Sequence, residues 1–384
     1  MTRGFSRIDR PAAVAGAAAA TLALIALTAA YTPGMPTPQP NLLINPTTEI
    51  DQANEGAAVA SSSGVLNAYV VDGIKVLLNS TATTKAAVSC QRTADAPTGY
   101  TYSLKCTVTT GASSVGAGDY LIVAIPIEAD AIQDARLGTA SAQTLCRQWQ
   151  VKASTGSYSY GWALQNFAQT RSLPNAETIA GAASWTPFSS CFSGDTGGTW
   201  VTSGSGGGAY LIVTIAAGST YQGTGGAWAG SNYFGTSALS NSILTTAGAT
   251  FEITNAKLEI SPVPTPFRHL SISQELARCE RYYEKTYDIG TAPGTATGIG
   301  SYRAIAPSTS WQMVTGFRVT KRAAPTMTLY STGTGAAGYL RDESMGSDLS
   351  GSSTNVGTNA FLAFSNSVTS GHVYGVHFTA DSRL

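Results

Sequence analysis

Few side chains in this sequence have the type and spacing that catalysis requires. Of the three histidines, His269 follows a proline-rich run, and His372 and His377 lie five positions apart in an expected strand, which places them on opposite faces. That arrangement does not suit a shared metal ion or a catalytic triad. No HExxH, GxSxG, Walker or dinucleotide-binding pattern is present. We therefore predict a protein without enzymatic activity, metal ion or other cofactor. A converging pair among the 22 acidic residues, as in a glycosidase, is the alternative that remains open.

Aromatic side chains give the clearest signal for ligand binding. Tyr158, Tyr160 and Trp162 alternate with small residues, so three rings share one face of an expected strand. Flat rings can cover the apolar face of a sugar while hydroxyls and amides bond to its hydroxyl groups. A stripe of this kind more often belongs to the core, which is the interpretation that we favour. Trp228 and Tyr233 lie in a Gly-rich segment, where we expect exposed rings or contact with a neighbouring subunit. These five residues are the candidate ligand-binding residues.

The composition predicts an all-β fold. Charged residues make up 11% of the 384 residues, against about 25% in an ordinary soluble protein. Exposed helices normally carry many Glu, Lys and Arg residues, so a largely helical protein is not expected. The formal net charge is zero, and the sequence therefore lacks the positive charge typical of nucleic-acid-binding proteins.

The first 40 residues differ from the rest of the chain. An Arg-containing start is followed by an uncharged, Ala-rich run as far as Ala30, and Tyr31–Pro40 contains four prolines. A secretory signal peptide and a membrane-spanning helix both fit this order. We favour a third hypothesis, an anchor that packs into a larger assembly and is followed by an extended spacer. The expected attachment residues are Arg3, Arg7, Arg10, Leu22, Leu24, Ile25 and Leu27.

Three further regions follow the N-terminal segment. Residues 41–265 contain short strand patterns separated by turn residues, which predicts a β-sandwich. Residues 266–289 hold a proline-rich linker and an expected helix within 271–287, capped by Ser273, with Leu276, Cys279, Tyr283 and Tyr287 on its apolar face. Residues 290–384 return to strand patterns and predict a smaller β domain.

Several longer motifs resemble one family. The most specific is TPFRHLSISQELARCERYYEKTY at residues 265–287, and others are NLLINPTTEIDQANEGAAV, RTADAPTGYTYSLKCTV, FEITNAKLEIS and VHFTADSRL. From about Asn41 to Leu384 the sequence resembles tail-fibre and other appendage proteins of tailed bacteriophages and prophages. The resemblance implies a jelly-roll-like antiparallel β-sandwich similar to carbohydrate-binding modules, a helical link and a C-terminal β domain. One departure is Gly73–Ile74, where family members commonly have Arg-Trp after Val-Asp.

The resemblance also implies a function and partners. It indicates a structural virion appendage that contacts host surface polysaccharide during adsorption, in a virion assembled in the host bacterial cytoplasm. We expect a homotrimer packed along the 271–287 helix and the C-terminal domain, and attachment to another virion protein through residues 1–30. The alternatives are a purely structural head or tail decoration fibre and a secreted carbohydrate-binding module.

The five cysteines show no metal-ligand spacing. Cys90 and Cys106 flank a turn-rich stretch and could face each other across a hairpin. Members of the family tend to carry aliphatic residues at these two positions, and virions assemble in a reducing cytosol. We therefore favour two core thiols over a disulfide. Cys279 is expected in the core, on the apolar face of the helix.

Overall fold

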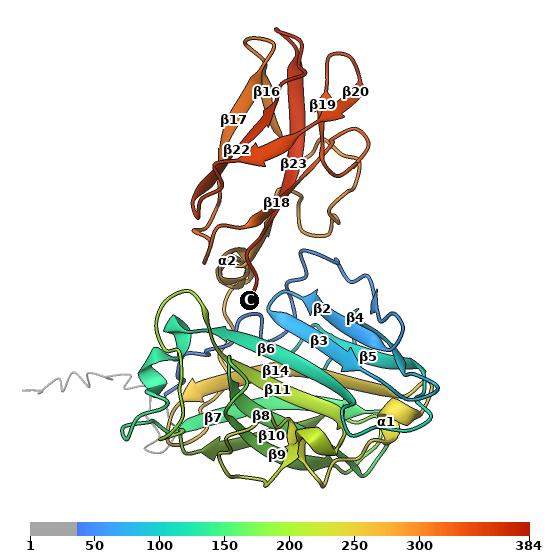
Figure 1. The fold of residues 1–384 in the computed structure, drawn as a ribbon, viewed down its shortest axis with the longest axis vertical. Coiled ribbons are helices and arrows are strands. Elements are labelled where there is room, and N and C mark those ends of the chain that lie inside the picture. The colour runs from blue at the N-terminus through green and yellow to red at the C-terminus, as the bar shows by residue number, and fades with distance from the viewer. Residues whose placement is uncertain (1–36) are drawn as a thin grey trace, which may run out of the picture. The chain divides into compact units, whose positions relative to one another are not determined.

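The computed structural model describes residues 37–384, and within that range the fold is nearly all β, as predicted. Two six-stranded antiparallel sheets pack face to face as a jelly-roll-like sandwich (Figure 1). One sheet contains, in spatial order, β1 (Val59–Ala60), β4 (Ala87–Thr93), β5 (Ser103–Thr110), β14 (Thr250–Ile260), β7 (Leu145–Ala153) and β10 (Thr186–Phe192). The other contains β2 (Val65–Val71), β3 (Ile74–Asn79), β6 (Tyr120–Glu128), β11 (Gly207–Ala217), β8 (Tyr158–Asn166) and β9 (Ser172–Ile179).

Short elements connect these strands. They are η1 (Asp130–Ala135), η2 (Ser219–Tyr221), β12 (Gln222–Gly223), β13 (Gly235–Thr236) and α1 (Ser242–Thr245). The parallel pair β12–β13 belongs to the segment between β11 and β14.

Alternation of apolar and polar residues explains several of the strands. In β5, Leu104, Cys106 and Val108 are buried between the sheets, as the sequence pattern predicts, while the residues between them are less buried. β3 alternates in the same way. The inward side chains of both sheets form one continuous core.

The difference at Gly73 from the phage-fibre sequence pattern has a local explanation. Val71 pairs with Ile74 across the β2–β3 hairpin, so Asp72 and Gly73 form its two-residue turn. Gly73 has a φ of +76°, and a Cβ atom there would lie 2.5 Å from the side chain of Ile44. Both the backbone conformation and the close approach of Ile44 require glycine.

Asp72, in the same turn, is a buried carboxyl group. Its side chain is 2% exposed among the residues described, and Oδ2 accepts a hydrogen bond of 2.7 Å from Nε2 of Gln52. Oδ1 has no hydrogen-bond partner in the described part of the chain. Burial raises the pKa of Asp72 from 3.8 to about 7. The folded state therefore holds this proton more tightly than the unfolded state, and the stability that the proton contributes is present below about pH 4 and lost as the pH rises through 7.

We predict that the free energy of unfolding of Asp72→Asn increases relative to that of the wild-type protein as the pH rises from 4.5 to 8. The amide cannot ionise, so the variant avoids the cost of a buried carboxylate, on the order of a few kcal/mol. Urea denaturation of both proteins at the two pH values measures the difference in the free energy of unfolding. A difference that is the same at both pH values would show that Asp72 has an ordinary pKa.

The structure contains two disulfides, and this corrects the preference for core thiols. Cys90 and Cys106 are directly opposite each other on β4 and β5, and they are bonded. Cys146 and Cys191 are likewise opposite on β7 and β10 and form a second disulfide, which the sequence analysis did not anticipate. Cys90 and Cys106 face each other across the β4–β5 hairpin, which the sequence analysis had considered possible. The register of β7 and β10, whose cysteines are 45 positions apart, is not visible in the sequence. Cys279 is free and buried, as expected.

The helix of the 266–289 region is shorter than its apolar spacing predicts. α2 spans Ile272–Glu280, and its N-cap is Ser271, whose side chain accepts a hydrogen bond from the backbone of Gln274 in a capping box. Tyr283 and Tyr287 lie beyond the helix. The chain instead forms β15 (Tyr283–Lys285), which pairs with β23 (Val373–Asp381). The hydrogen bonds of that pairing replace those of a further helical turn.

The C-terminal region has its own core of buried residues, between Ala306 and Ala380. One sheet contains β15, β23, β19 (Tyr339–Asp342) and β20 (Ser347–Ser350), and β16 (Tyr302–Ile305) and β18 (Thr326–Tyr330) also pair with β23. A second sheet contains β17 (Trp311–Gly316), β22 (Ala360–Ser365) and β21 (Ser352–Thr354).

The charged residues of the 271–287 motif are engaged in ion pairs. The pairs are Glu275 with Arg278, Glu280 with Arg318, Arg281 with Glu128, Glu284 with Lys321, and Lys285 with Glu55. Two of the partners, Glu55 and Glu128, belong to the sandwich region, and two, Arg318 and Lys321, to the C-terminal region. The motif therefore connects both regions through paired charges rather than through an apolar helix face.

Candidate functional site

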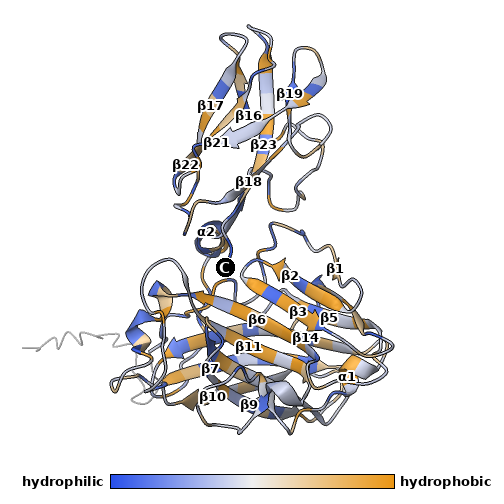
Figure 2. Ribbon diagram, viewed as in Figure 1, coloured by the Kyte–Doolittle hydropathy of each residue, from blue (hydrophilic) through white to orange (hydrophobic). Residues whose placement is uncertain are grey.

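The candidate site lies on the outer face of the sheet that contains β6 and β11. In β6, Leu121 and Val123 point to the sandwich core, and Ile122 and Ala124 lie on the opposite face. β11 repeats this pattern, and Figure 2 shows both strands as largely apolar. An antiparallel sheet normally presents polar residues on the face turned away from its core. Here Ile122, Ala124 and Ile212 are 2–3% exposed, because they form a second, small core with Phe234 of the Gly-rich segment, and partly buried tyrosine rings pack against it.

Strand register creates a hollow at the middle of this face. Ala124 lies opposite Lys75 on β3 and opposite Ile212 on β11. The short side chain of Ala124 leaves space between the longer side chains around it. The hollow has a volume of about 130 Å³. This is smaller than the roughly 300–1,000 Å³ of sites for drug-sized ligands, so it suits one ring of a ligand that continues over the surface.

A cluster of three aromatic rings forms one end of the hollow. Tyr221 stacks on Phe234 with ring centroids 4.4 Å apart, and Tyr120 meets both rings edge-on at 5.2 and 5.4 Å. Thr214 Oγ1 donates a hydrogen bond of 2.8 Å to the carbonyl of Phe234, which fixes the Gly-rich segment to the outer face of β11. The sheet thus holds the rings of the segment in a defined position.

Another ring pair and three amides lie farther along the same face. Tyr210 stacks on Phe167 at 4.6 Å. Gln165 Nε2 donates to Asn232 Oδ1 at 2.8 Å, and Asn232 Nδ2 donates to Gln169 Oε1 at 3.3 Å. Gln169 is exposed, so its own amide nitrogen can still donate to a ligand.

The hollow combines apolar surface with unused polar groups. The hydroxyls of Tyr120, Tyr210 and Tyr221 take part in no hydrogen bond within residues 37–384. Burial raises the pKa of Tyr120 and of Tyr210, so both hydroxyls remain neutral donors. The lining residues are Lys75, Leu77, Tyr120, Ile122, Ala124, Gln169, Tyr210, Ile212, Tyr221, Asn232 and Phe234.

The hollow is lined by neither a carboxyl nor an imidazole group, as far as the described residues show. Within residues 37–384 no group of three His, Cys, Asp or Glu side chains is placed to hold a metal ion. The arrangement can stack against a ligand and bond to it, which are the actions of a binding site.

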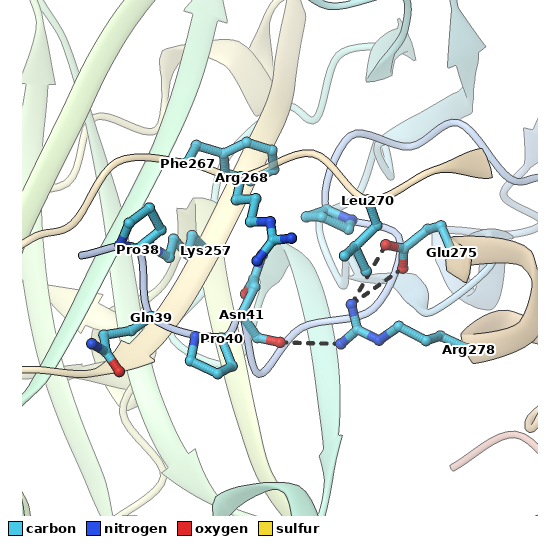
Figure 3. A pocket seen from close by; sticks show the side chains of 11 residues that line it. Pro38, Gln39, Pro40, Asn41, Lys257, Phe267, Arg268, Leu270, Glu275 and Arg278 are labelled. Atoms are coloured by element: carbon cyan, nitrogen blue, oxygen red, sulfur yellow. Dashed lines mark hydrogen bonds and ion pairs between the residues drawn. The ribbon is translucent and has the colours of Figure 1, made fainter. Parts of the chain in front are cut away.

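A larger hollow, of about 370 Å³, lies between the Pro38–Pro46 segment, the linker at Phe267–Leu270 and α2 (Figure 3). Most of its polar groups already serve the fold. Arg278 donates to the carbonyl of Asn41 at 3.1 Å and pairs with Glu275, as the dashed lines in Figure 3 mark. Glu275 in turn accepts from the backbone of Asn45, and these contacts join α2 to the start of the sandwich. This hollow is therefore a structural crevice.

The aromatic stripe predicted as a candidate platform belongs to the core, and its assignment as a ligand-binding surface is corrected. Tyr158, Tyr160 and Trp162 are 1%, 0% and 2% exposed. Their strand, β8, directs them between the two sheets, where Trp149 Nε1 donates to the Tyr160 hydroxyl at 2.8 Å. These three rings therefore lie in the core, which was the favoured interpretation of the stripe.

The two candidates of the Gly-rich segment lie outside the lining of the hollow. Trp228 is partly buried, donates to the carbonyl of Ser193 at 2.9 Å and meets Trp200 edge-on at 5.7 Å. Tyr233 packs its ring against Gly223, while its neighbours Asn232 and Phe234 line the hollow. The composition of the segment identified it as a candidate, but it did not show which of its consecutive residues face the hollow.

A signal for the missed residues is present in the sequence. YLIVAIPIE in β6 and AYLIVTIAA in β11 are apolar at nearly every position, without the alternation of a half-buried strand. Such strands are covered on both faces or carry a site on one of them.

The attachment residues Arg3, Arg7, Arg10, Leu22, Leu24, Ile25 and Leu27 lie outside the described residues. In the described part of the chain, no helix combines the length and the apolar character needed to cross a bilayer.

Comparisons with known proteins give only distant similarities. No family model matches the sequence, and no curated protein matches it. Among solved structures, a putative sugar binding protein from Bacteroides thetaiotaomicron is 13% identical, with 58% of this chain and 100% of that chain covered and a TM-score of 0.29. TmCBM61 in complex with beta-1,4-galactotriose is 10% identical, with 58% and 99% covered and a TM-score of 0.27. The enzymatically active domain of bacteriophage CBA120 tailspike protein 4 is 8% identical, with 58% and 21% covered and a TM-score of 0.29. Because these scores are low, what this chain binds is argued from its own residues.

Proposed function

We propose that this protein binds carbohydrate in the hollow on the outer face of β3, β6 and β11, and that it does not hydrolyse it. The observation that carries this proposal is a set of partly exposed tyrosines around an apolar depression, whose hydroxyls have no hydrogen-bond partner among the described residues. Sugar rings need both a flat apolar contact and several hydrogen-bond partners. The rings of Tyr120, Tyr210 and Tyr221 and the amides of Gln169 and Asn232 supply both.

The lining supports binding without hydrolysis. Most glycosidases use two carboxyl groups, about 5–9.5 Å apart, on either side of the bond to be cleaved. The hollow is lined by no carboxyl group, as judged from the described residues. A sugar seated there would meet no pair of carboxyl groups of the kind that most glycosidases use.

Two biological settings fit this binding site. The resemblance to phage fibres supports a homotrimeric virion appendage that contacts host surface glycan, with residues 1–30 attached to another virion protein. The disulfides Cys90–Cys106 and Cys146–Cys191 favour a second setting, a secreted carbohydrate-binding module, because disulfides form mainly in oxidising compartments. Recovery of the protein from purified virions would support the first setting, and recovery from cell-free medium of uninfected bacteria would support the second.

We predict that Tyr210→Ala weakens glycan binding about tenfold or more. The substitution removes a ring and a hydroxyl from the hollow and separates Phe167 from its stacking partner. A panel of immobilised microbial polysaccharides identifies a ligand for the wild-type protein, and calorimetry then compares the variants.

The matched control is Tyr339→Ala, which removes a 43% exposed tyrosine from the C-terminal region. It should leave the affinity unchanged. Far-UV circular dichroism and thermal denaturation confirm that each variant is folded. Full affinity in a folded Tyr210→Ala protein would refute the proposed site, and a wild-type protein that binds no member of the panel would refute the proposed function.

A further inference from the structure

Lys75 is the only charged residue that lines the hollow, as far as the described residues show. It lies on β3 opposite Tyr69 of β2 and Ala124 of β6, and its Nζ is 5.3 Å from the centroid of the Tyr69 ring. Lys75 is half-buried and lines the hollow beside Ala124. Within residues 37–384, Lys75 forms no ion pair and donates no side-chain hydrogen bond to the protein.

The charges around Lys75 do not compensate it. The guanidinium of Arg383 also lies near the Tyr69 ring, 4.5 Å from its centroid, and is itself paired with Asp381. The Tyr69 hydroxyl donates to a backbone oxygen of Leu384, so that oxygen is engaged by Tyr69 rather than by Lys75. Partial burial lowers the pKa of Lys75, and the charge of Arg383 lowers it further. An ammonium group that is half-buried beside another cation is stabilised when an anion binds next to it.

Two hydrogen-bond donors near Lys75 could also bind the oxygen atoms of an acidic group. The hydroxyl of Tyr210 and the exposed amide of Gln169 line the same hollow, and each can donate a hydrogen bond to an oxygen atom of a ligand. No carboxylate among the lining residues would repel an anion. The aromatic rings meanwhile require a flat, partly apolar body next to that anion. Because Lys75 is the one cation lining the hollow in the described residues, we expect the ligand to carry one negative charge at this position.

We propose that the hollow selects an acidic sugar, a pyranose that carries one carboxylate, over the neutral sugar of the same shape. Lys75 pairs with the carboxylate while the tyrosine rings cover the sugar ring. This inference rests on the proposed carbohydrate binding and narrows it to uronic-acid units. It also assigns Lys75 as the residue that determines the specificity.

The test compares matched oligosaccharides that differ only in charge. Oligomers of galacturonate, glucuronate and mannuronate are each measured by calorimetry beside their carboxyl-reduced counterparts, which are neutral and keep the same linkages. For at least one pair, the wild-type protein should bind the uronate at least tenfold more tightly at low salt. Added NaCl should reduce this preference, because ions screen a partly exposed charge pair.

Two variants separate the pairing from general electrostatics. Lys75→Met should lower the affinity for the uronate about tenfold or more and should change the affinity for the neutral oligomer by a much smaller factor. Lys85→Met removes the same charge from an exposed position on the same sandwich and should change neither. Equal loss in both variants would show a nonspecific effect of net charge and would overturn the inference.

The outcomes also separate this inference from the proposed function. Binding of neutral oligomers that Tyr210→Ala weakens, with no gain from the carboxylate, would overturn the acidic-sugar inference and leave carbohydrate binding in place. A uronate preference that persists in a folded Lys75→Met protein would overturn the assignment of Lys75. Absence of binding to every oligomer, and to every member of the polysaccharide panel, would overturn both.

Discussion

Glu177→Gln is expected to lower the free energy of unfolding by about 3 kcal/mol, because it leaves a buried cation without its counterion. The cation is Arg147, whose side chain is fully buried between the sheets. Its guanidinium lies 4.1 and 4.6 Å from the ring centroids of Trp149 and Trp162. Glu177 on β9 is its ion-pair partner and also accepts a hydrogen bond of 2.6 Å from Tyr160.

Two observations make the loss of this one carboxylate costly. Nε and Nη1 of Arg147 have no hydrogen-bond partner within the described residues, and Glu177 is the only carboxylate there that pairs with it. Burial also lowers the pKa of Arg147, to about 10, which shows how poorly the site solvates a charge. A neutral glutamine can still accept from Tyr160, so the variant removes the charge and keeps that hydrogen bond.

The measurement is urea denaturation at pH 7 with matched controls. Arg147→Met combined with Glu177→Gln should recover most of the lost stability, because no charge is then buried. Glu343→Gln breaks an ion pair with Arg303, whose side chain is 49% exposed, and should cost less than about 1 kcal/mol. A Glu177→Gln protein within 1 kcal/mol of wild type would show that Arg147 does not depend on this pair.

The same cluster shows what the sequence could and could not predict. Alternation correctly placed Leu104, Cys106 and Val108 in the core, and it indicated that Tyr158, Tyr160 and Trp162 share a face. It gave no indication that an arginine lies on the inward face of β7. The partner of Arg147 is Glu177, 30 positions away on a strand of the other sheet, and only the packed sandwich brings them together.

The site was predicted in part for a similar reason. Composition drew attention to the Gly-rich segment around Tyr233, and its neighbours Asn232 and Phe234 line the hollow. The lining, however, combines that segment with β3, β6 and β11, whose order in the sheet depends on long-range pairing. The prediction that the helix after Pro266 includes Tyr283 and Tyr287 was wrong for the same physical reason. Long-range pairing of β15 with β23 outweighs the helical spacing of these two residues.

Lys321→Met should be at least as destabilising, lowering the free energy of unfolding by about 3–5 kcal/mol. Lys321 and Glu284 form an ion pair of 2.5 Å, and both side chains are at most 1% exposed. The ammonium group also donates to the carbonyls of Glu280 at 2.5 Å and Val319 at 3.0 Å. Methionine fills much of the space but leaves the Glu284 carboxylate buried with only the backbone N–H of Arg318 to bond it.

The location of this pair makes the expected effect regional as well as large. Glu284 lies in β15, which pairs with β23 at the centre of the C-terminal sheet. Hydrogen exchange followed by mass spectrometry should therefore show the greatest loss of protection in residues 281–384. The sandwich strands β6 and β11 should change least, because their core is separate from that of the C-terminal region.

A double-mutant cycle decides whether the pair or the volume of Lys321 is responsible. Lys321→Met with Glu284→Gln removes both charges, and it should be more stable than Lys321→Met alone. Additive losses would contradict the prediction, since they would mean that the two side chains act independently. A favourable coupling would instead identify this pair as the contact through which the most specific motif of the chain, residues 265–287, stabilises the C-terminal β domain.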